Sequence, residues 1–227
     1  MSEALADGPG RGGLAQTYFR RRYTILFYSL LLTAVAAPGL GARRFHGGVL
    51  ESFLAFNLLL ALMPTRATRG RTAVWAALAI LGAARLVAVW LEYATLSAIA
   101  LGTWAVVGLL AAAGALRFAM RARLVDAEHL YAALSAYLLA GIYLGLFYWV
   151  LEQIRPSSFA LTGELSRFGA IYFSFVTLAT LGYGDIVPRS DLARSLAIVE
   201  GIGGQLFLAV LVARLVSLYV RGKDASG

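Results

Sequence analysis

The sequence has no cysteine and only two histidines among its 227 residues. The lack of cysteine excludes disulfides, thiolate metal sites and cysteine nucleophiles. His46 and His129 have no partners at the spacing of a metal site, so we expect them to be interfacial polar residues. Paired carboxylates, or a nucleophile with its base, are also missing at helical or loop spacing. An enzyme is therefore disfavoured.

Charged residues are scarce as well, at 14% of the chain, whereas 60% of the residues are hydrophobic. The mean hydropathy is +0.75. A soluble domain needs more polar surface, so most of the chain is expected to lie in a lipid bilayer. The net charge of +8 comes from short basic clusters between apolar runs, a distribution typical of membrane topology signals. These basic residues form no stripe with interleaved aromatics, so nucleic-acid binding is not expected.

Six apolar stretches approach the ~20 residues that a helix needs to cross a bilayer core of ~30 Å. They are residues 23–39, 48–64, 73–92, 95–116, 128–151 and 192–219. A seventh stretch, 168–179, is too short to span and lies between the fifth and the sixth. At membrane depth such a half-helix is tolerated only inside protein or beside a water-filled cavity. The sequence therefore predicts an all-α membrane protein with six transmembrane helices and a re-entrant helix between helices five and six.

Basic residues at the ends of these stretches predict the orientation. Clusters of basic residues lie at 20–22, 66–71, 117–123 and 221–223, all on the same side of the membrane if the six stretches span it. The side with the excess of basic residues is the cytoplasmic one. Both termini are therefore expected in the cytoplasm, in a multi-pass protein of the inner (plasma) membrane. Three arginines precede a short apolar run that contains Ala34-Val35-Ala36, so cleavage of the first stretch as a signal peptide stays an alternative that would not invert the later spans.

The peptide 180–185 reads Thr-Leu-Gly-Tyr-Gly-Asp and follows the short stretch directly. A potassium ion that enters a pore loses its water shell, and backbone carbonyls replace that shell if several point inward at successive levels. Consecutive residues in one backbone conformation do not aim their carbonyls to one side, but glycine adopts positive φ without a Cβ clash. Gly182 and Gly184, which alternate with larger residues, therefore permit the geometry. We expect potassium sites at the carbonyls of Thr180, Leu181, Gly182 and Tyr183, with the Thr180 hydroxyl closing the innermost site.

Residues around this peptide are expected to support it. We call the ion-coordinating peptide 180–185 the filter. Tyr172 and Phe173, with Tyr183, supply aromatic bulk that can hold this filter at a fixed diameter, and Thr177 lies just upstream. Asp185 at the outer mouth can accept hydrogen bonds or attract cations. The short helix ends with its negative dipole end toward a central cavity, which favours a cation there. One chain supplies one loop, whereas a cage of oxygens around an axis needs several, so a closed fourfold ring is the implied assembly.

Residues 128–220 resemble the pore module of the potassium channel superfamily, with outer helix, pore helix, selectivity filter and inner helix in order. Pro188 and Arg194 fall where this superfamily often has an outer-mouth proline and a basic residue that opens the inner helix. Gly204 falls at its inner-helix hinge. The resemblance implies passive conduction of K+ by a homotetramer in the bilayer, with K+ ions in the filter and no organic cofactor or nucleic acid.

The same resemblance divides the chain into five parts. They are a cytoplasmic segment 1–22, a four-helix transmembrane domain 23–116 that resembles a degenerate voltage-sensor domain, a cytoplasmic linker 117–127, the pore domain 128–220 and a cytoplasmic tail 221–227. Two residues depart from the superfamily pattern. Leu181 replaces a commoner valine or isoleucine and Ala179 a commoner threonine, but neither change removes an ion-facing carbonyl.

Polar residues and glycines interrupt the last apolar stretch. A buried carboxylate in a membrane helix is costly and usually functional, so Glu200 is expected to brace the pore helix or concentrate cations. Pairing with an arginine, or hydrogen bonding behind the filter, is an equal alternative. Gln205 is expected to face the cavity. The glycines, with Gly204 at the hinge position, form either a gating hinge, as the resemblance favours, or a close-packing surface of small residues.

The fourth stretch has no basic residue between Leu96 and Leu116. A voltage sensor needs several charges there, because each one that crosses the field is worth only ~2.3 kcal/mol per 100 mV. Strong voltage gating is therefore not expected, and the layout is closest to small prokaryotic six-span channels without a charged sensor. The tail after Arg221 is too short for a ligand-binding domain, so gating by such a domain implies a separate regulatory subunit.

Two other functions stay open. One is a subunit of a potassium-uptake transporter, although such chains generally repeat the pore module and keep fewer filter glycines. The other is a non-selective cation channel, against which the intact Gly182-Tyr183-Gly184 argues.

Overall fold

The computed structural model describes residues 21–41, 48–62, 82–83, 94–121 and 126–224. Regular structure in these ranges consists of helices and two very short strands. The helices are α2 (Arg22–Gly41), α3 (Gly48–Leu62), α5 (Ala94–Met120), α6 (Ala127–Ile154), α7 (Arg167–Leu178) and α8 (Asp191–Asp224), and the strands are β1 (Phe159–Ala160) and β2 (Val187–Pro188).

The predicted stretches and the observed helices agree to within five residues at either end, except that the stretch 73–92 lies almost entirely outside the described residues. Among the residues that the structure describes, three helical segments are long and apolar enough to cross a membrane: Ser97–Met120, Ala127–Ile154 and Asp191–Ser217. Helix α3 has 15 residues, which gives a length of about 22 Å at the usual rise per residue. The helical fold is therefore confirmed, while the arrangement of six spans stays a prediction.

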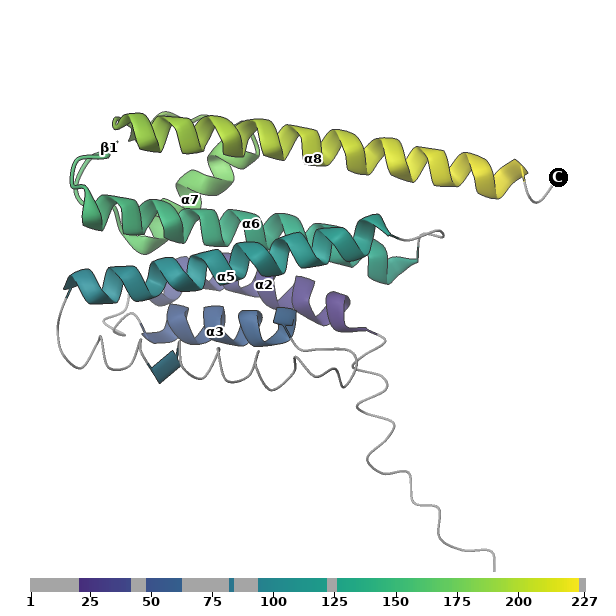
Figure 1. Cartoon of the computed structure of the whole chain (residues 1–227), viewed down its shortest axis with the longest axis horizontal. Coiled ribbons are helices and arrows are strands. Elements are labelled where there is room, and N and C mark those ends of the chain that lie inside the picture. Colours follow the sequence, from purple (N-terminus) through teal and green to yellow (C-terminus); the bar gives the residue numbers. More distant parts are fainter. Residues whose placement is uncertain (1–20, 42–47, 63–81, 84–93, 122–125, 225–227) are drawn as a thin grey trace, which may run out of the picture.

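The helices stack in layers (Figure 1). In this view α8 lies above α7, α7 above α6, and α5, α2 and α3 follow below. Helix α6 is the central element, because it packs against α5 and α2 on one side and against α7 on the other. Helix α8 contacts mainly α7. The short helix α7 is thus held between the two long helices α6 and α8.

Close approach of α7 to α6 depends on two glycines one helical turn apart. A methyl group at Gly145 would lie 2.8 Å from the Ile171 backbone nitrogen, and one at Gly141 would overlap the Phe175 ring, with its Cζ atom 2.7 Å away. Small residues at this spacing let helix backbones approach closely in membranes. The Gly141–Gly145 spacing therefore fixes where α7 crosses α6.

Tyr143 connects α6 with α5 and α3. Its ring occupies the space in front of Gly108 on α5, where any larger residue would overlap it. Its buried hydroxyl donates a hydrogen bond of 3.2 Å to the Leu54 carbonyl of α3. One side chain of α6 thereby reaches through the α5 layer to α3.

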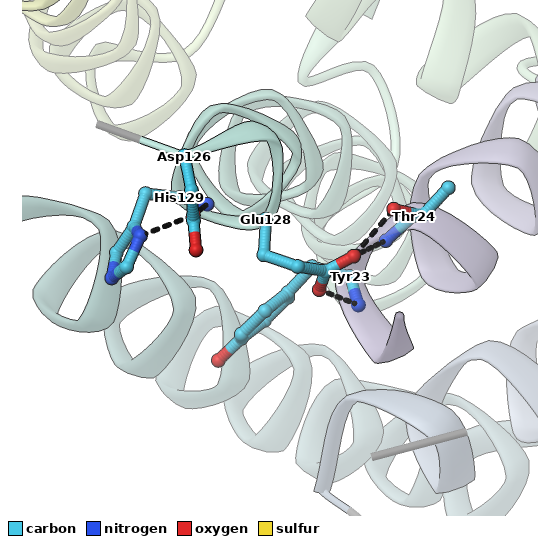
Figure 2. Close-up of polar contacts among 5 residues, drawn as sticks. All are labelled: Tyr23, Thr24, Asp126, Glu128 and His129. Carbon is cyan, nitrogen blue, oxygen red and sulfur yellow. Dashed lines mark hydrogen bonds and ion pairs between the residues drawn. The ribbon is translucent and has the colours of Figure 1, made fainter. Parts of the chain in front are cut away.

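The start of α2 and the start of α6 are joined by hydrogen bonds (Figure 2), and the end of α5 packs against both. The Glu128 carboxylate of α6 accepts hydrogen bonds from the backbone amides of Tyr23, at 3.0 Å, and Thr24, at 3.4 Å. It also accepts one from the Thr24 hydroxyl. Phe118 of α5 stacks on Tyr23 and, with ring centroids 4.7 Å apart, on His129. The first amides of α2 are therefore capped by a residue of α6.

Candidate functional site

Helix α7 ends in a turn that leads directly into the candidate filter. The Leu181 amide donates to the Val176 carbonyl at 2.9 Å, and the Thr180 amide donates to the Thr177 carbonyl at 3.0 Å. The C-cap is Ala179, and this pair of bonds is the Schellman motif, in which the residue after the C-cap is normally a left-handed glycine. Here that residue is Thr180, with φ of 56°. Positive φ is a true outlier for a β-branched residue, so threonine occupies this position at a conformational cost.

Left-handed backbone recurs at alternate positions of the peptide. Gly182 has φ of 57° and Gly184 has φ of 79°, while Leu181 and Tyr183 between them do not have positive φ. The side chains are 56% exposed at Leu181 and 66% exposed at Tyr183, and all residues from 179 to 185 are exposed in the single chain. The peptide thus lies at an open face of the subunit. Along it, residues with left-handed backbone alternate with residues without it.

The aromatic residues expected to support the filter separate into two groups. The ring of Tyr172 is stacked on that of Tyr183, with centroids 6.4 Å apart. The ring of Phe173 is buried on the opposite side, in edge-to-face contact with Tyr148 and Phe159. Adjacent helical residues point about 100° apart, so only Tyr172 lies beside the filter. Phe173 instead packs α7 against α6.

The segments before α7 and after the filter are joined. Strands β1 and β2 pair antiparallel, with Phe159 opposite Pro188. The Ser158 carbonyl accepts hydrogen bonds from the amides of Arg189, at 2.7 Å, and Ser190, at 3.2 Å. The Arg194 side chain donates to the Pro188 carbonyl at 3.3 Å. The loop that contains α7 and the filter is therefore closed at its base, and Asp185 lies exposed within it.

Glu200 of α8 is buried, with 3% of its surface exposed, and it contacts two other helices. Its carboxylate accepts a hydrogen bond of 2.6 Å from the Tyr148 hydroxyl of α6 and another from the Ser174 hydroxyl of α7. A buried carboxylate needs such donors, because an unpaired charge in this environment is very costly. Glu200 thus lies behind α7 and joins α6, α7 and α8.

The glycines of α8 differ in their surroundings. A methyl group at Gly204 would overlap the Leu178 carbonyl oxygen at the end of α7, whereas one at Gly203 would meet no atom within 4 Å. Gly204 therefore provides the close-packing surface that the sequence offered as one alternative, while its role as a gating hinge stays a prediction. The next residue, Gln205, is exposed, and its side-chain amide donates to the Thr180 hydroxyl oxygen at 3.3 Å.

Sequence reasoning missed several members of this site. Tyr148 and Ser174, the partners of Glu200, lie in apolar runs that carry no local signal of a polar role. The left-handed conformation of Thr180 is also absent from the sequence pattern, which points only to the glycines. The spacing of Gly141 and Gly145 is a signal that would have located the crossing of α6 and α7.

Comparison with known proteins gives similarity to ion channels. Residues 134–221 match the ion channel family. The inward rectifier potassium channel Kirbac3.1 of Paramagnetospirillum magnetotacticum is 36% identical over 72 residues, which are 32% of this chain and 22% of that protein. The two-pore potassium channel 4 of Arabidopsis thaliana is 50% identical over 48 residues, 21% of this chain and 17% of that protein.

A third relative is the probable potassium channel protein 2 of Methanocaldococcus jannaschii. It is 41% identical over 59 residues, which are 25% of this chain and 16% of that protein. The chain therefore spans about a fifth of the length of these curated relatives. The comparison with solved structures found no match. Over residues 134–221, which hold most of α6, all of α7, the filter peptide and most of α8, the chain is similar to the ion channel family, and the relatives named here are potassium channels.

Proposed function

We propose that four copies of this chain form a potassium-selective pore through which K+ flows passively down its electrochemical gradient. The observation that carries the proposal is the backbone after α7, where positive φ at Thr180, Gly182 and Gly184 alternates with the residues between them. A flip of the backbone at every second residue is the means by which successive carbonyls can be aimed toward one axis. Rings of such carbonyls replace the hydration shell of K+.

The exposure of the subunit supports assembly around an axis. More than half of the α6 span is buried within the single chain, at 56%, but only 11% of the α8 span. Large apolar residues of α8, among them Ile198 and Ile202, are more than half exposed. The filter peptide lies on the same open part of the subunit, since Gln205 of α8 contacts Thr180. A homotetramer would place this face around the pore and leave α5, α2 and α3 outside it.

We propose the same membrane orientation that the basic clusters predict, with both termini in the cytoplasm of an inner (plasma) membrane. In support, Arg22 at the start of α2 and Arg117 at the end of α5 are both close to Phe118 and so lie at one end of the molecule. Helix α5 carries no basic residue before Arg117, so residues 23–116 are proposed to act as a four-helix domain without strong voltage sensing. A separate regulatory subunit remains part of this proposal.

Ion flux in liposomes tests the proposal. The purified protein is reconstituted, and potassium and sodium flux are measured at a fixed membrane potential. The Gly182→Ala variant is expected to abolish the selective flux, because a Cβ disfavours the positive φ of that residue. Gly163 supplies a matched control, since it has φ of 89° and equally open surroundings but lies in the loop before α7.

The Gly163→Ala variant is expected to keep selective flux, because it carries the same kind of backbone strain away from the filter. Equal flux of sodium and potassium through the unmodified protein would contradict selectivity and favour the non-selective channel. Equal loss of flux in both glycine variants would show that the filter position has no special role.

A further inference from the structure

A contact between Gln205 and Thr180 joins α8 to the start of the filter peptide. Helix α8 provides it one residue after Gly204, where the helix touches the end of α7. Thr180 occupies a left-handed position at which glycine is preferred. The threonine side chain therefore makes the backbone conformation of this residue less favourable. A reason for a hydroxyl at this position must lie in what the hydroxyl contacts.

The backbone that carries Gln205 is fixed relative to α7 at two points. Gly204 has no space for a side chain in front of the Leu178 carbonyl. One helical turn earlier, Glu200 is hydrogen-bonded to Ser174 of α7. The Gln205 side chain therefore starts from a position that is set by the same helix whose end forms the filter.

A threonine hydroxyl has two lone pairs and one rotatable hydrogen. If one lone pair accepts a hydrogen bond from Gln205, the other remains for a cation, and the hydroxyl hydrogen can point away from both. The same donor withdraws electron density from the oxygen and weakens its attraction for a cation. Conduction requires an ion site that is favourable enough to enter and weak enough to leave. One amide donor can serve both requirements.

We propose that Gln205 is a positioning residue for the innermost potassium site: its side-chain amide orients the Thr180 hydroxyl that closes this site and thereby sets selectivity. This inference rests on the proposed channel function. The Gln205 side-chain amide donates to the Thr180 hydroxyl, so it acts through Thr180. Its removal changes ion discrimination only as long as the hydroxyl is present.

The test is a double-mutant cycle in reconstituted liposomes, with the ratio of potassium to sodium flux as the readout. Gln205→Met keeps the length of the side chain and removes the donor. Thr180→Val keeps the branched shape and removes the hydroxyl. The Gln205→Met variant is expected to change the flux ratio by about two- to tenfold, the factor that one hydrogen bond of ordinary net strength represents. In the Thr180→Val background the same change is expected to have no further effect, because coupled residues do not add.

Gln153→Met is the matched control, since Gln153 is exposed at the end of α6, and it is expected to leave the flux ratio unchanged. Thermal unfolding of each variant separates a loss of assembly from a change in selectivity. Additive effects of the two substitutions, or a Gln205→Met variant with the ratio of the unmodified protein, would overturn the inference and leave the channel intact. Absence of selective flux in the unmodified protein would instead contradict the proposed function.

Discussion

The Tyr148 hydroxyl donates a hydrogen bond of 2.6 Å to the Glu200 carboxylate and so ties α6 to α8 inside the protein. The Ser174 hydroxyl donates to the other carboxylate oxygen from α7. All three residues are buried. Helices α6, α7 and α8 therefore share one polar centre, to which α7, the helix before the candidate filter, contributes Ser174.

Removal of the Tyr148 hydroxyl is expected to destabilise the protein. In the Tyr148→Phe variant Glu200 loses the Tyr148 donor and keeps the Ser174 donor. A buried acceptor that loses its donor costs about 1–3 kcal/mol. Thermal unfolding in detergent measures the loss. Tyr28→Phe is the control, because the Tyr28 hydroxyl is exposed and makes only a weak 3.4 Å contact with Tyr131. Equal stability of the two variants would argue against a structural role of the Tyr148 bond.

Alanine substitutions at the two neighbouring glycines of α8 are expected to have opposite effects. Gly204→Ala introduces a methyl group against the Leu178 backbone, which cannot move without displacing the end of α7. It is expected to destabilise the protein by about 1–3 kcal/mol, the usual cost of overpacking. Gly203→Ala meets open space and is expected to stabilise α8 by about 0.5–1 kcal/mol through helix propensity. Thermal unfolding of the two variants decides the matter, and a destabilised Gly203→Ala variant with an unaffected Gly204→Ala variant would contradict the packing described.

Replacement of Thr180 by glycine is expected to separate stability from function. The Thr180→Gly variant relieves the left-handed strain and gains about 1 kcal/mol, but it loses the hydroxyl proposed to close the innermost site. Selective potassium flux in liposomes should fall while the unfolding temperature rises. The Thr180→Ser variant keeps the hydroxyl and is expected to retain selective flux. A Thr180→Gly variant with full selectivity would show that the hydroxyl is dispensable.

Acid is expected to weaken the start of α6. The Asp126 carboxylate caps this helix by accepting a hydrogen bond of 3.0 Å from the His129 amide, and this bond holds the pKa of Asp126 below its ordinary value of 3.8. Because the pKa is lower in the folded state, the charged cap stabilises the protein fully at pH values above the ordinary pKa of 3.8. This stabilisation is lost as the pH falls through the folded-state pKa. The cap is worth about 1 kcal/mol.

The Asp126→Asn variant keeps a capping side chain that does not titrate. Its thermal stability is expected to match that of the unmodified protein at pH 7 and to exceed it at pH 3 in detergent. Asp126→Ala is the control, since it lacks the cap at both pH values. A constant difference between the unmodified protein and the Asp126→Asn variant from pH 7 to pH 3 would contradict the role of the carboxylate.

The helices could be predicted from the sequence because apolar runs with basic or glycine-rich borders define them. The short helix α7 was distinguishable from the spans by length alone, since 12 residues cannot cross a bilayer. Positive φ at Gly182 and Gly184 followed from the spacing of two glycines. These features depend on neighbours in the sequence, and local patterns carry that information.

Contacts between distant residues could not be predicted in the same way. Glu200 was recognised as costly in an apolar helix, but its donors are separated from it by 26 and 52 residues. A serine or a tyrosine in an apolar run can have many different partners, so its sequence position alone does not identify it as a donor to Glu200. Phe173 was expected at the filter because it adjoins Tyr172, yet the turn of the helix directs it toward Tyr148. Only the packing of α7 between α6 and α8 decides which face each residue occupies.

The bond between Glu128 and the start of α2 joins residues that are 105 positions apart in the chain (Figure 2). A ribosome adds about 5–20 residues per second. Helix α2 therefore exists for several seconds before the residue that caps it has been made. During biosynthesis the N-terminal end of α2 must rely on water or lipid head groups for its free amides, and the arrival of α6 replaces them. Helix α6 thus completes the capping of α2, so the start of α2 reaches its final form only after the second half of the protein has begun to be made.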